Sequence, residues 1–311
     1  MVETPVLYIA YARPEYARQS FDAIKAVKPK KLYFYSNIAR ADRPDEIRRN
    51  NEVRAMAKEV DWDCELKTYF RDDYVDIFPS LWSAIDWVFA NEEQAIVLEE
   101  DAVATQGFFE YCEFMLKHYK EEKDVWLISG NNFTPEYSPK GFDVFFSRYA
   151  GIWGWAGWRD RWEKMDRKMT SYPTEGKKAL QNYFGSRIQA WQMGKRLDST
   201  YRKAQKDGPW DLIFWYNVIL NNGKFARPSA PLVTNVETYG TNHDIRANLQ
   251  KKTIIASQRE HFFVSRIPDT ISFCNSYDTR HYWKYRFFGT LKRKTIILIN
   301  SVLISLKVKK I

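Results

Sequence analysis

Two hydrophobic periodicities alternate along the first hundred residues of the chain. Short apolar or alternating runs predict β-strands at "VLYIAY", "KLYFYSN", "CELKTYF" and "AIVLEED". The stretches between them carry apolar residues at helical spacing and predict helices at residues 14–27, 42–60 and 79–91. Strands that alternate with helices are typical of an α/β fold whose mostly parallel sheet is covered by helices. Such sheets bind ligands beyond the carboxyl ends of their strands.

The pattern continues with a predicted helix at residues 107–119 and a short strand at "VWLISGN", and then becomes less regular. Residues 132–210 are rich in Trp, Tyr, Gly, Lys and Arg, which indicates a segment that builds a site. No Pro-, Gly- or Ser-rich linker precedes residue 266. We therefore predict one domain over residues 1–265 and a basic, aromatic tail over residues 266–311.

The fourth predicted strand runs directly into three carboxylates, Glu99, Glu100 and Asp101. In an extended chain Glu99 and Asp101 point to one side and Glu100 to the other. Oxygen ligands without His or Cys beside them suit Mg²⁺ or Mn²⁺, which commonly bind through one or two carboxylates and substrate phosphates. The alternative is a solvated acidic turn. A buried strand that ends in three acids favours the cation site.

Positive charge is confined to the end of the chain. Residues 280–311 hold nine of the 48 Lys and Arg and none of the 39 Asp and Glu, so the net charge of +9 belongs to them. Their apolar run "TIILINSVLISL" is too short for a bilayer, which needs about 20 residues. Its basic and aromatic surroundings favour peripheral contact with an anionic membrane, with a docked amphipathic helix as the alternative. The neutral body argues against nucleic acid as a partner.

Three cysteines, Cys64, Cys112 and Cys274, lie too far apart for a zinc motif and are odd in number. We expect them to be reduced, and the protein to be cytoplasmic and peripheral on the inner face of the cell membrane. The N-terminus has no basic stretch ahead of its apolar run, which argues against a secretion signal. The sequence gives no indication of the oligomeric state.

Two further segments carry candidate chemistry. In "RYAGIWGWAGWRDRW", glycines recur at every third residue between tryptophans, which predicts a ligand wall, with a Trp-rich core as the alternative. Downstream, Asp211 opens the apolar helix "WDLIFWYNVIL", where an acid can be a helix cap or a catalytic base. His243 lies in the polar loop "YGTNHD".

Four stretches of the chain resemble a known family: "AIDWVFANEEQAIVLEEDAVATQGFFEYCEFMLKHY", "SGNNF", "FFSRYAGIWGWAGWRDRWEKMD" and "APLVTNVETYGTNHD". They look like the bacterial nucleotide-diphospho-sugar transferases often labelled haemolysin-like glycosyltransferases, which are similar in layout to N-acetylglucosaminyltransferase I. The resemblance covers roughly residues 4–245. It implies the GT-A fold, a Rossmann-like, mostly parallel sheet flanked by helices.

Position by position, the resemblance implies roles for single residues. Asp101 is the expected Mn²⁺ ligand, His243 touches the metal or the diphosphate, and Asp211 is the catalytic base. Arg13 and the pair Ser36-Asn37 occupy nucleotide-binding turns, while Glu99 and Glu100 belong to the sugar-nucleotide motif. From the Gly/Trp segment we add Arg148 as a second cation for the diphosphate, and Trp153 and Gly154 as the ligand wall. The chain departs from the family pattern at Glu100, where Asp is more usual, and at Leu212, where the relative has a second acid.

The combined prediction is a metal-dependent, inverting glycosyltransferase of polysaccharide biosynthesis. Its donor is a nucleotide-diphosphate sugar, a UDP-sugar such as UDP-GlcNAc, and its acceptor is a hydroxyl of a lipid-linked or cell-surface glycan. One alternative is a sugar-phosphate nucleotidyltransferase, which usually carries a Gly-rich loop that "AYARPEYARQ" lacks. The other is a non-catalytic carbohydrate-binding module, which would need neither Asp101 nor Asp211.

Overall fold

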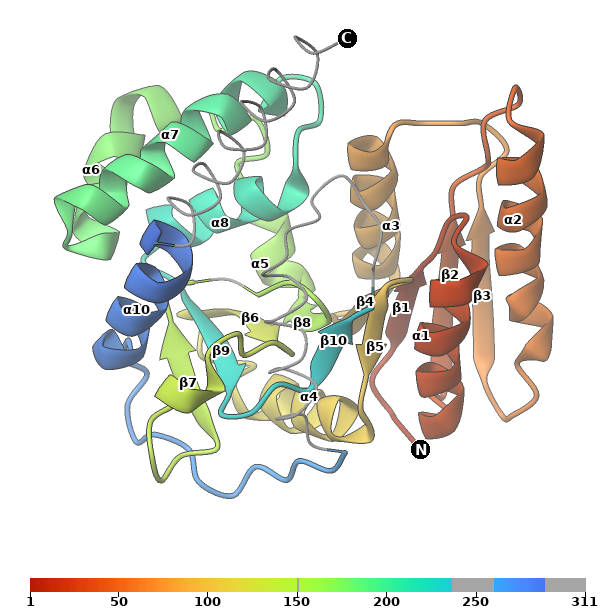
Figure 1. The fold of residues 1–311 in the computed structure, drawn as a ribbon, viewed down its shortest axis with the longest axis horizontal. Helices are drawn as coiled ribbons and strands as arrows, with labels where there is room; N and C mark the ends of the chain where they lie inside the picture. The colour runs from red at the N-terminus through yellow and green to blue at the C-terminus, as the bar shows by residue number, and fades with distance from the viewer. Residues whose placement is uncertain (150, 237–259, 289–311) are drawn as a thin grey trace, which may run out of the picture.

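The computed structural model describes residues 1–149, 151–236 and 260–288 (Figure 1). Over these residues its main feature is an eight-stranded sheet in the order β3-β2-β1-β4-β8-β6-β9-β7. Only β8 and β7 run antiparallel to their neighbours. The predicted α/β class, with a mostly parallel sheet flanked by helices, is confirmed. The strands of this sheet are β1 Val6–Ile9, β2 Lys31–Ser36, β3 Glu65–Phe70, β4 Gln94–Glu99, β6 Val125–Ser129, β7 Val144–Ser147, β8 Trp155–Trp158 and β9 Lys224–Pro228.

Helices cover both faces of the sheet and bury a separate core on each side. In β1, Val6 and Tyr8 face one core and Leu7 and Ile9 face the other, as the period of a strand requires. The first core is closed by α1 Pro14–Val27, α2 Pro44–Ala55, η1 Met56–Glu59 and α4 Gln106–His118. The second is closed by α3 Ile77–Asn91, α5 Arg159–Glu163, α6 Tyr172–Phe184, α7 Arg187–Ala204 and α8 Trp210–Leu220. In Figure 1, α6 to α8 gather at the upper left, away from α1 and α2 at the right.

A short second sheet fixes the chain directly after the acidic strand end. Strand β5, Ala102–Ala104, pairs antiparallel with β10, Val233–Asn235. The backbone N–H of Val236 donates to the carbonyl oxygen of Asp101 at 2.8 Å. A segment more than a hundred residues downstream therefore holds the acids at the edge of the main sheet.

The irregular segment of residues 132–210 contains more regular structure than its pattern indicated. It holds the short strands β7 and β8, the turn η2 Pro135–Tyr137, and three helices, α5 to α7. Strand β8 is inserted antiparallel between β4 and β6, and each of its four residues is buried. A four-residue strand with Trp at both ends and Gly inside carries too little alternation to be recognised from the sequence.

The first part of the predicted tail packs on the domain. The backbone N–H groups of Ser265 and Arg266 donate to the carboxylate of Asp143 at 3.0 and 2.8 Å, and Phe273 bridges to Phe146 of β7. Helix α10, Asn275–His281, and the π-helix η3, Tyr282–Phe287, follow. Residues 275–287 thus pack on the domain. Residues 289–311, which include the apolar run of the predicted membrane-contacting or docked helix, lie outside the described residues. No helix in the described part of the chain is long and apolar enough to cross a membrane.

Candidate active site

Three parallel strands end side by side and bring their following residues together. Ile9 of β1 is in register with Tyr35 of β2 on one side and with Glu99 of β4 on the other. The turns after these strands therefore meet at one edge of the sheet, where they surround a cavity of about 370 Å³. Five of the residues predicted from the sequence line this cavity: Arg13, Asn37, Glu99, Glu100 and Asp101.

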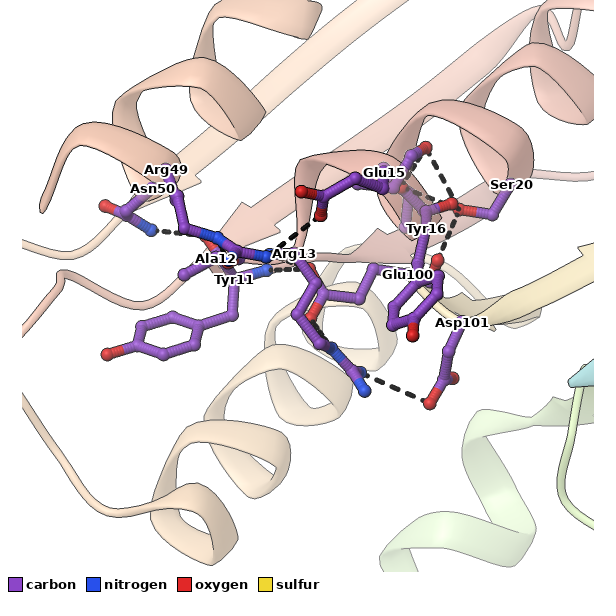
Figure 2. A network of polar contacts seen from close by, with 12 residues as sticks. Tyr11, Ala12, Arg13, Glu15, Tyr16, Ser20, Arg49, Asn50, Glu100 and Asp101 are labelled. Atoms are coloured by element: carbon purple, nitrogen blue, oxygen red, sulfur yellow. Dashed lines mark hydrogen bonds and ion pairs between the residues drawn. The ribbon is translucent and has the colours of Figure 1, made fainter. Parts of the chain in front are cut away.

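Arg13 and Glu100 hold the turn between β1 and α1. Glu100 is only 4% exposed, and its carboxylate accepts from the N–H of Tyr11 at 2.8 Å and from Arg13 Nε at 2.6 Å. Its carbonyl oxygen accepts from the hydroxyl of Ser20 at 2.9 Å. Figure 2 shows the Arg13 guanidinium reaching from Glu100 to Asp101, whose Oδ2 lies 3.2 Å from Nη2. Glu100 thus anchors the turn, and its predicted contact with the sugar nucleotide stays a prediction.

Glu99, the last residue of β4, lies between like charges. Burial raises the pKa of its carboxyl, and the negative charges of Asp101 and Asp211 raise it further, to about 8. The positive charge of Arg13 acts in the opposite direction without cancelling them. Glu99 therefore holds its proton near neutral pH, and the site would gain from an added cation.

Asp211 is the second residue of α8, and its charge acts on the acidic strand end. Burial raises its pKa, while hydrogen bonds from backbone N–H groups at the helix start and the charges of Arg196 and Arg286 lower it. The net result is a carboxyl with a pKa above its usual range, which makes the carboxylate a stronger base than an ordinary Asp. The predicted position at a helix start is confirmed.

Two arginines near Asp211 were missed by the sequence reasoning. Arg196 comes from α7, and Arg286 comes from η3, where its guanidinium lies 4.8 Å from the ring centroid of Trp215 and 5.4 Å from that of Tyr149. Burial, with a further contribution from the charge of Arg196, lowers the pKa of Arg286 to about 9, whereas Asp211 opposes the change. The basic character of residues 280–286 was visible in the sequence, but it was interpreted as membrane contact or a docked helix and not as part of a site.

Two residues that were predicted to contact the nucleotide sugar, Ser36 and Arg148, do not line the cavity at the acidic strand end. Ser36 is fully buried, and its hydroxyl donates to the carbonyl of Asn37 and accepts from Asn50. Arg148 forms an ion pair with Asp278 of α10 at 3.1 Å, and its guanidinium lies 3.9 Å from the ring centroid of Phe273. Both sit in polar contacts inside the fold, which a sequence pattern does not distinguish from ligand contacts.

The Gly/Trp segment packs mainly as core. Trp155, Trp158 and Trp162 are at most 3% exposed. Trp153 packs edge-on against Phe133, with ring centroids 5.0 Å apart, and does not line the cavity at Glu99. Gly154 has φ +64°, and a Cβ there would lie 2.7 Å from Val233, so glycine is required for the turn into β8. The Trp-rich core interpretation describes this segment better than the ligand wall.

Four residues that line the cavity from one segment of the chain were not among the predicted site residues. Tyr74, Ile77, Ser80 and Leu81 come from the loop after β3 and the first turns of α3. The amide nitrogen of Asn37 holds this loop by donating to the carbonyl of Val75 at 2.7 Å. The cavity is therefore lined by aromatic and apolar side chains as well as by the acids.

The carboxylates fit one divalent cation shared with a ligand. Among the described residues, no group of three or more His, Cys, Asp or Glu has the spacing of a complete metal site. Glu99 and Asp101 supply hard oxygen donors, which suit Mg²⁺ or Mn²⁺ when substrate phosphates provide further ligands. His243, the second predicted metal ligand, lies outside the described residues.

No family model and no curated protein matches the chain. UDP-glucose pyrophosphorylase from Acinetobacter baumanii is 10% identical over 82% of this chain and 99% of that one, with a TM-score of 0.36. An apo UDP-glucose pyrophosphorylase is 8% identical over 72% and 90%, with a TM-score of 0.34. The glycosyltransferase GlyE of Streptococcus pneumoniae TIGR4 is 13% identical over 72% and 45%, with a TM-score of 0.34. Scores of this size support no inference, so function is argued from the residues of the site.

Proposed function

We propose that the protein is a metal-dependent, inverting glycosyltransferase that moves a sugar from a nucleotide-diphosphate sugar to a hydroxyl of a glycan acceptor. The observation that carries the proposal is the electrostatic interaction of Asp211 with the acidic end of β4, beside the cavity that Glu99 lines: the charge of Asp211 raises the pKa of Glu99. Glycosyl transfer needs a cation site for the diphosphate, a pocket for the donor and a general base. The acidic strand end, the cavity and Asp211 are proposed to supply them in that order.

The cavity is the proposed donor site. Its wall of Tyr11, Tyr74, Ile77 and Leu81 suits the flat face of a nucleoside base. The cavity is also lined by the acids, with Arg13 placed between Glu100 and Asp101. We expect a UDP-sugar, with UDP-GlcNAc as the first donor to test.

Asp101 and Glu99 would hold the Mn²⁺ or Mg²⁺ ion together with the donor diphosphate, and His243 stays a proposed ligand. When bound, the cation neutralises charge that develops on the departing diphosphate. Glu99 would lose its proton on cation binding, because the added positive charge favours its ionised form. Arg13 keeps the Asp101 carboxylate at the mouth of the cavity.

Asp211 is the proposed general base. Its ionised carboxylate would accept the proton of the acceptor hydroxyl as the oxygen attacks the anomeric carbon. Arg196 and Arg286 favour the ionised form of Asp211 through their positive charge. A base on the face opposite the leaving group gives inversion at the anomeric carbon.

The test is a product assay that separates three activities. The protein is incubated with Mn²⁺ and a panel of nucleotide-diphosphate sugars, and release of the nucleoside diphosphate is measured with and without glycan acceptors. The proposal predicts Mn²⁺-dependent release of UDP from one UDP-sugar. Pyrophosphate release from UTP and a sugar 1-phosphate would instead identify a nucleotidyltransferase. Sugar binding without turnover would identify a carbohydrate-binding module.

The basic C-terminal segment suggests that the acceptor glycan lies at the membrane. Of the predicted membrane segment 280–311, we expect the part after Phe288 to hold the protein on an anionic inner membrane, where lipid-linked glycans are built, because Arg286 lies against Tyr149 and Trp215 of the domain. Since α10 and η3 pack on the domain up to Phe287, the test is a truncation after Phe288. Sedimentation with phosphatidylglycerol vesicles should be lost on truncation, and unchanged sedimentation would refute the membrane role.

A further inference from the structure

A second hollow lies on the outer surface, between α6 and α7. It has a volume of about 1030 Å³ and shares no lining residue with the cavity at the acidic strand end. Its walls are formed by Tyr172 to Asn182 on α6 and Arg187 to Asp198 on α7. This volume is at the upper end of the range for sites that hold a ligand. We call it the α6–α7 groove.

The groove has an exposed aromatic side chain on its α7 wall. Trp191 is 57% exposed, and the ammonium of Lys195 lies 3.9 Å from its ring centroid. Gly194, one turn along the helix, presents no side chain to the groove. A single exposed Trp is unremarkable by itself. Trp191, however, lies in a groove whose wall also carries the amides of Gln181 and Asn182.

The charge of the groove is strongly positive. Four of its lining residues are cations, Lys177, Lys178, Arg187 and Lys195, and in the described ranges of the chain none of the four forms an ion pair. Its one acid, Asp198, accepts a hydrogen bond from the hydroxyl of Tyr172 at 2.8 Å. Cations that cluster without acidic partners repel one another, and an anionic ligand would relieve that repulsion.

We propose that the α6–α7 groove binds an acidic glycan. An indole face packs on the apolar side of a sugar ring, amides hydrogen-bond its hydroxyls, and the lysines pair with carboxylate or phosphate substituents. A hollow lined by amides suits a chain of sugar rings better than a membrane surface, which binds protruding apolar and basic side chains. The inference goes beyond the proposed transfer reaction and does not depend on it, so a failed transfer assay would leave it standing.

The test compares an acidic with a neutral glycan by isothermal titration calorimetry on the full chain. The probes are an oligogalacturonate and a maltodextrin of equal length, at physiological ionic strength. The oligogalacturonate should bind at least about tenfold more tightly than the maltodextrin. The groove variants are Trp191→Ala and the double change Lys177→Glu with Lys178→Glu, all at exposed positions. Each should weaken oligogalacturonate binding at least about tenfold.

The matched control makes the same change of charge outside the groove. Arg202→Glu with Lys203→Glu lies on the same helix, α7, and neither residue lines the groove. This variant should bind the oligogalacturonate within about twofold of the wild type. Equal loss in groove and control variants, or no binding by the wild type, would overturn the proposal. A third outcome is that the protein binds phosphatidylglycerol vesicles only when the groove is intact and binds neither glycan. That outcome would overturn the glycan proposal and identify a lipid headgroup as the ligand.

Discussion

Glu99 at the end of β4 and Asp211 at the start of α8 belong to opposite halves of the chain, yet the charge of Asp211 acts directly on the carboxyl of Glu99. Burial and like charge together raise the pKa of Glu99 to about 8. At neutral pH Glu99 therefore holds a proton, whereas in the proposed mechanism Asp211 is the carboxylate that accepts one. The predictions below separate these two tasks.

Asp211→Asn should abolish transfer while leaving donor binding intact. The amide keeps the shape of the side chain but cannot accept the proton of the acceptor, so kcat should fall about 10²–10⁴-fold. Donor affinity, measured by calorimetry with the UDP-sugar and Mn²⁺, should stay within about threefold of the wild type. Asp101→Asn should instead weaken donor binding as well as turnover. A variant of Asp211 that retains full turnover would remove its role as base and the prediction of inversion.

Arg196→Gln should move the acid limb of the pH–rate profile to higher pH. The proposed base must be ionised, and its raised pKa places the limb above the usual value for Asp of about 3.9. The positive charge of Arg196 lowers the pKa of Asp211, so its removal raises that pKa further. Arg202→Gln, on the same helix, serves as the control and should leave the limb unchanged. A shift to lower pH in Arg196→Gln would contradict the assignment.

Glu99→Gln should stabilise the protein at high pH. The pKa of Glu99 is about 8 in the folded protein, against about 4.3 in an unfolded chain, so folding favours the protonated form. The wild type therefore loses stability as pH rises from about 4 to 8, while the neutral amide avoids this loss. The melting temperature of the variant should match the wild type near pH 4 and exceed it at pH 8 by about 2–4 °C or more. Glu93→Gln, at an exposed surface pair with Lys120, should show no such gain.

Asp278→Ala should loosen the C-terminal segment. Asp278 is 4% exposed, accepts from the Ser147 hydroxyl at 2.6 Å and pairs with Arg148 at 3.1 Å. Loss of one partner of a buried ion pair costs about 3–5 kcal/mol, because the other charge remains buried. Urea unfolding should show this loss, and limited proteolysis should cut sooner within residues 275–287. Asp269→Ala, exposed in the same segment, should behave like the wild type, and equal behaviour of the two variants would contradict the packing of α10.

Much of the fold was readable because its central strands are buried on both faces. Strands of this kind appear as continuous apolar runs, and the acids that interrupt such a run at residue 99 marked the edge of the sheet where the cavity lies. The helix start at Asp211 was also predictable, because an acid precedes a long apolar stretch. These predictions needed only local pattern and the rule for the carboxyl ends of parallel strands.

The misplaced residues depend on contacts that no local pattern contains. Arg148 looked like a free cation because its partner, Asp278, follows 130 residues later. Gly154 looked like a ligand contact, although it is required by the close approach of Val233. Arg286 was assigned to a membrane patch because only the folded chain places it beside Asp211. In each case a long-range contact decides the role.

The packing of α10 against β7 has a consequence for how the protein is made. Ser147 and Arg148 both form hydrogen bonds with Asp278, and Tyr277, which is fully buried, completes the same surface. During synthesis the N-terminal part of a chain emerges first and begins to fold before the rest exists. The outer strand β7 therefore lacks this cover until residues 275–287 have left the ribosome.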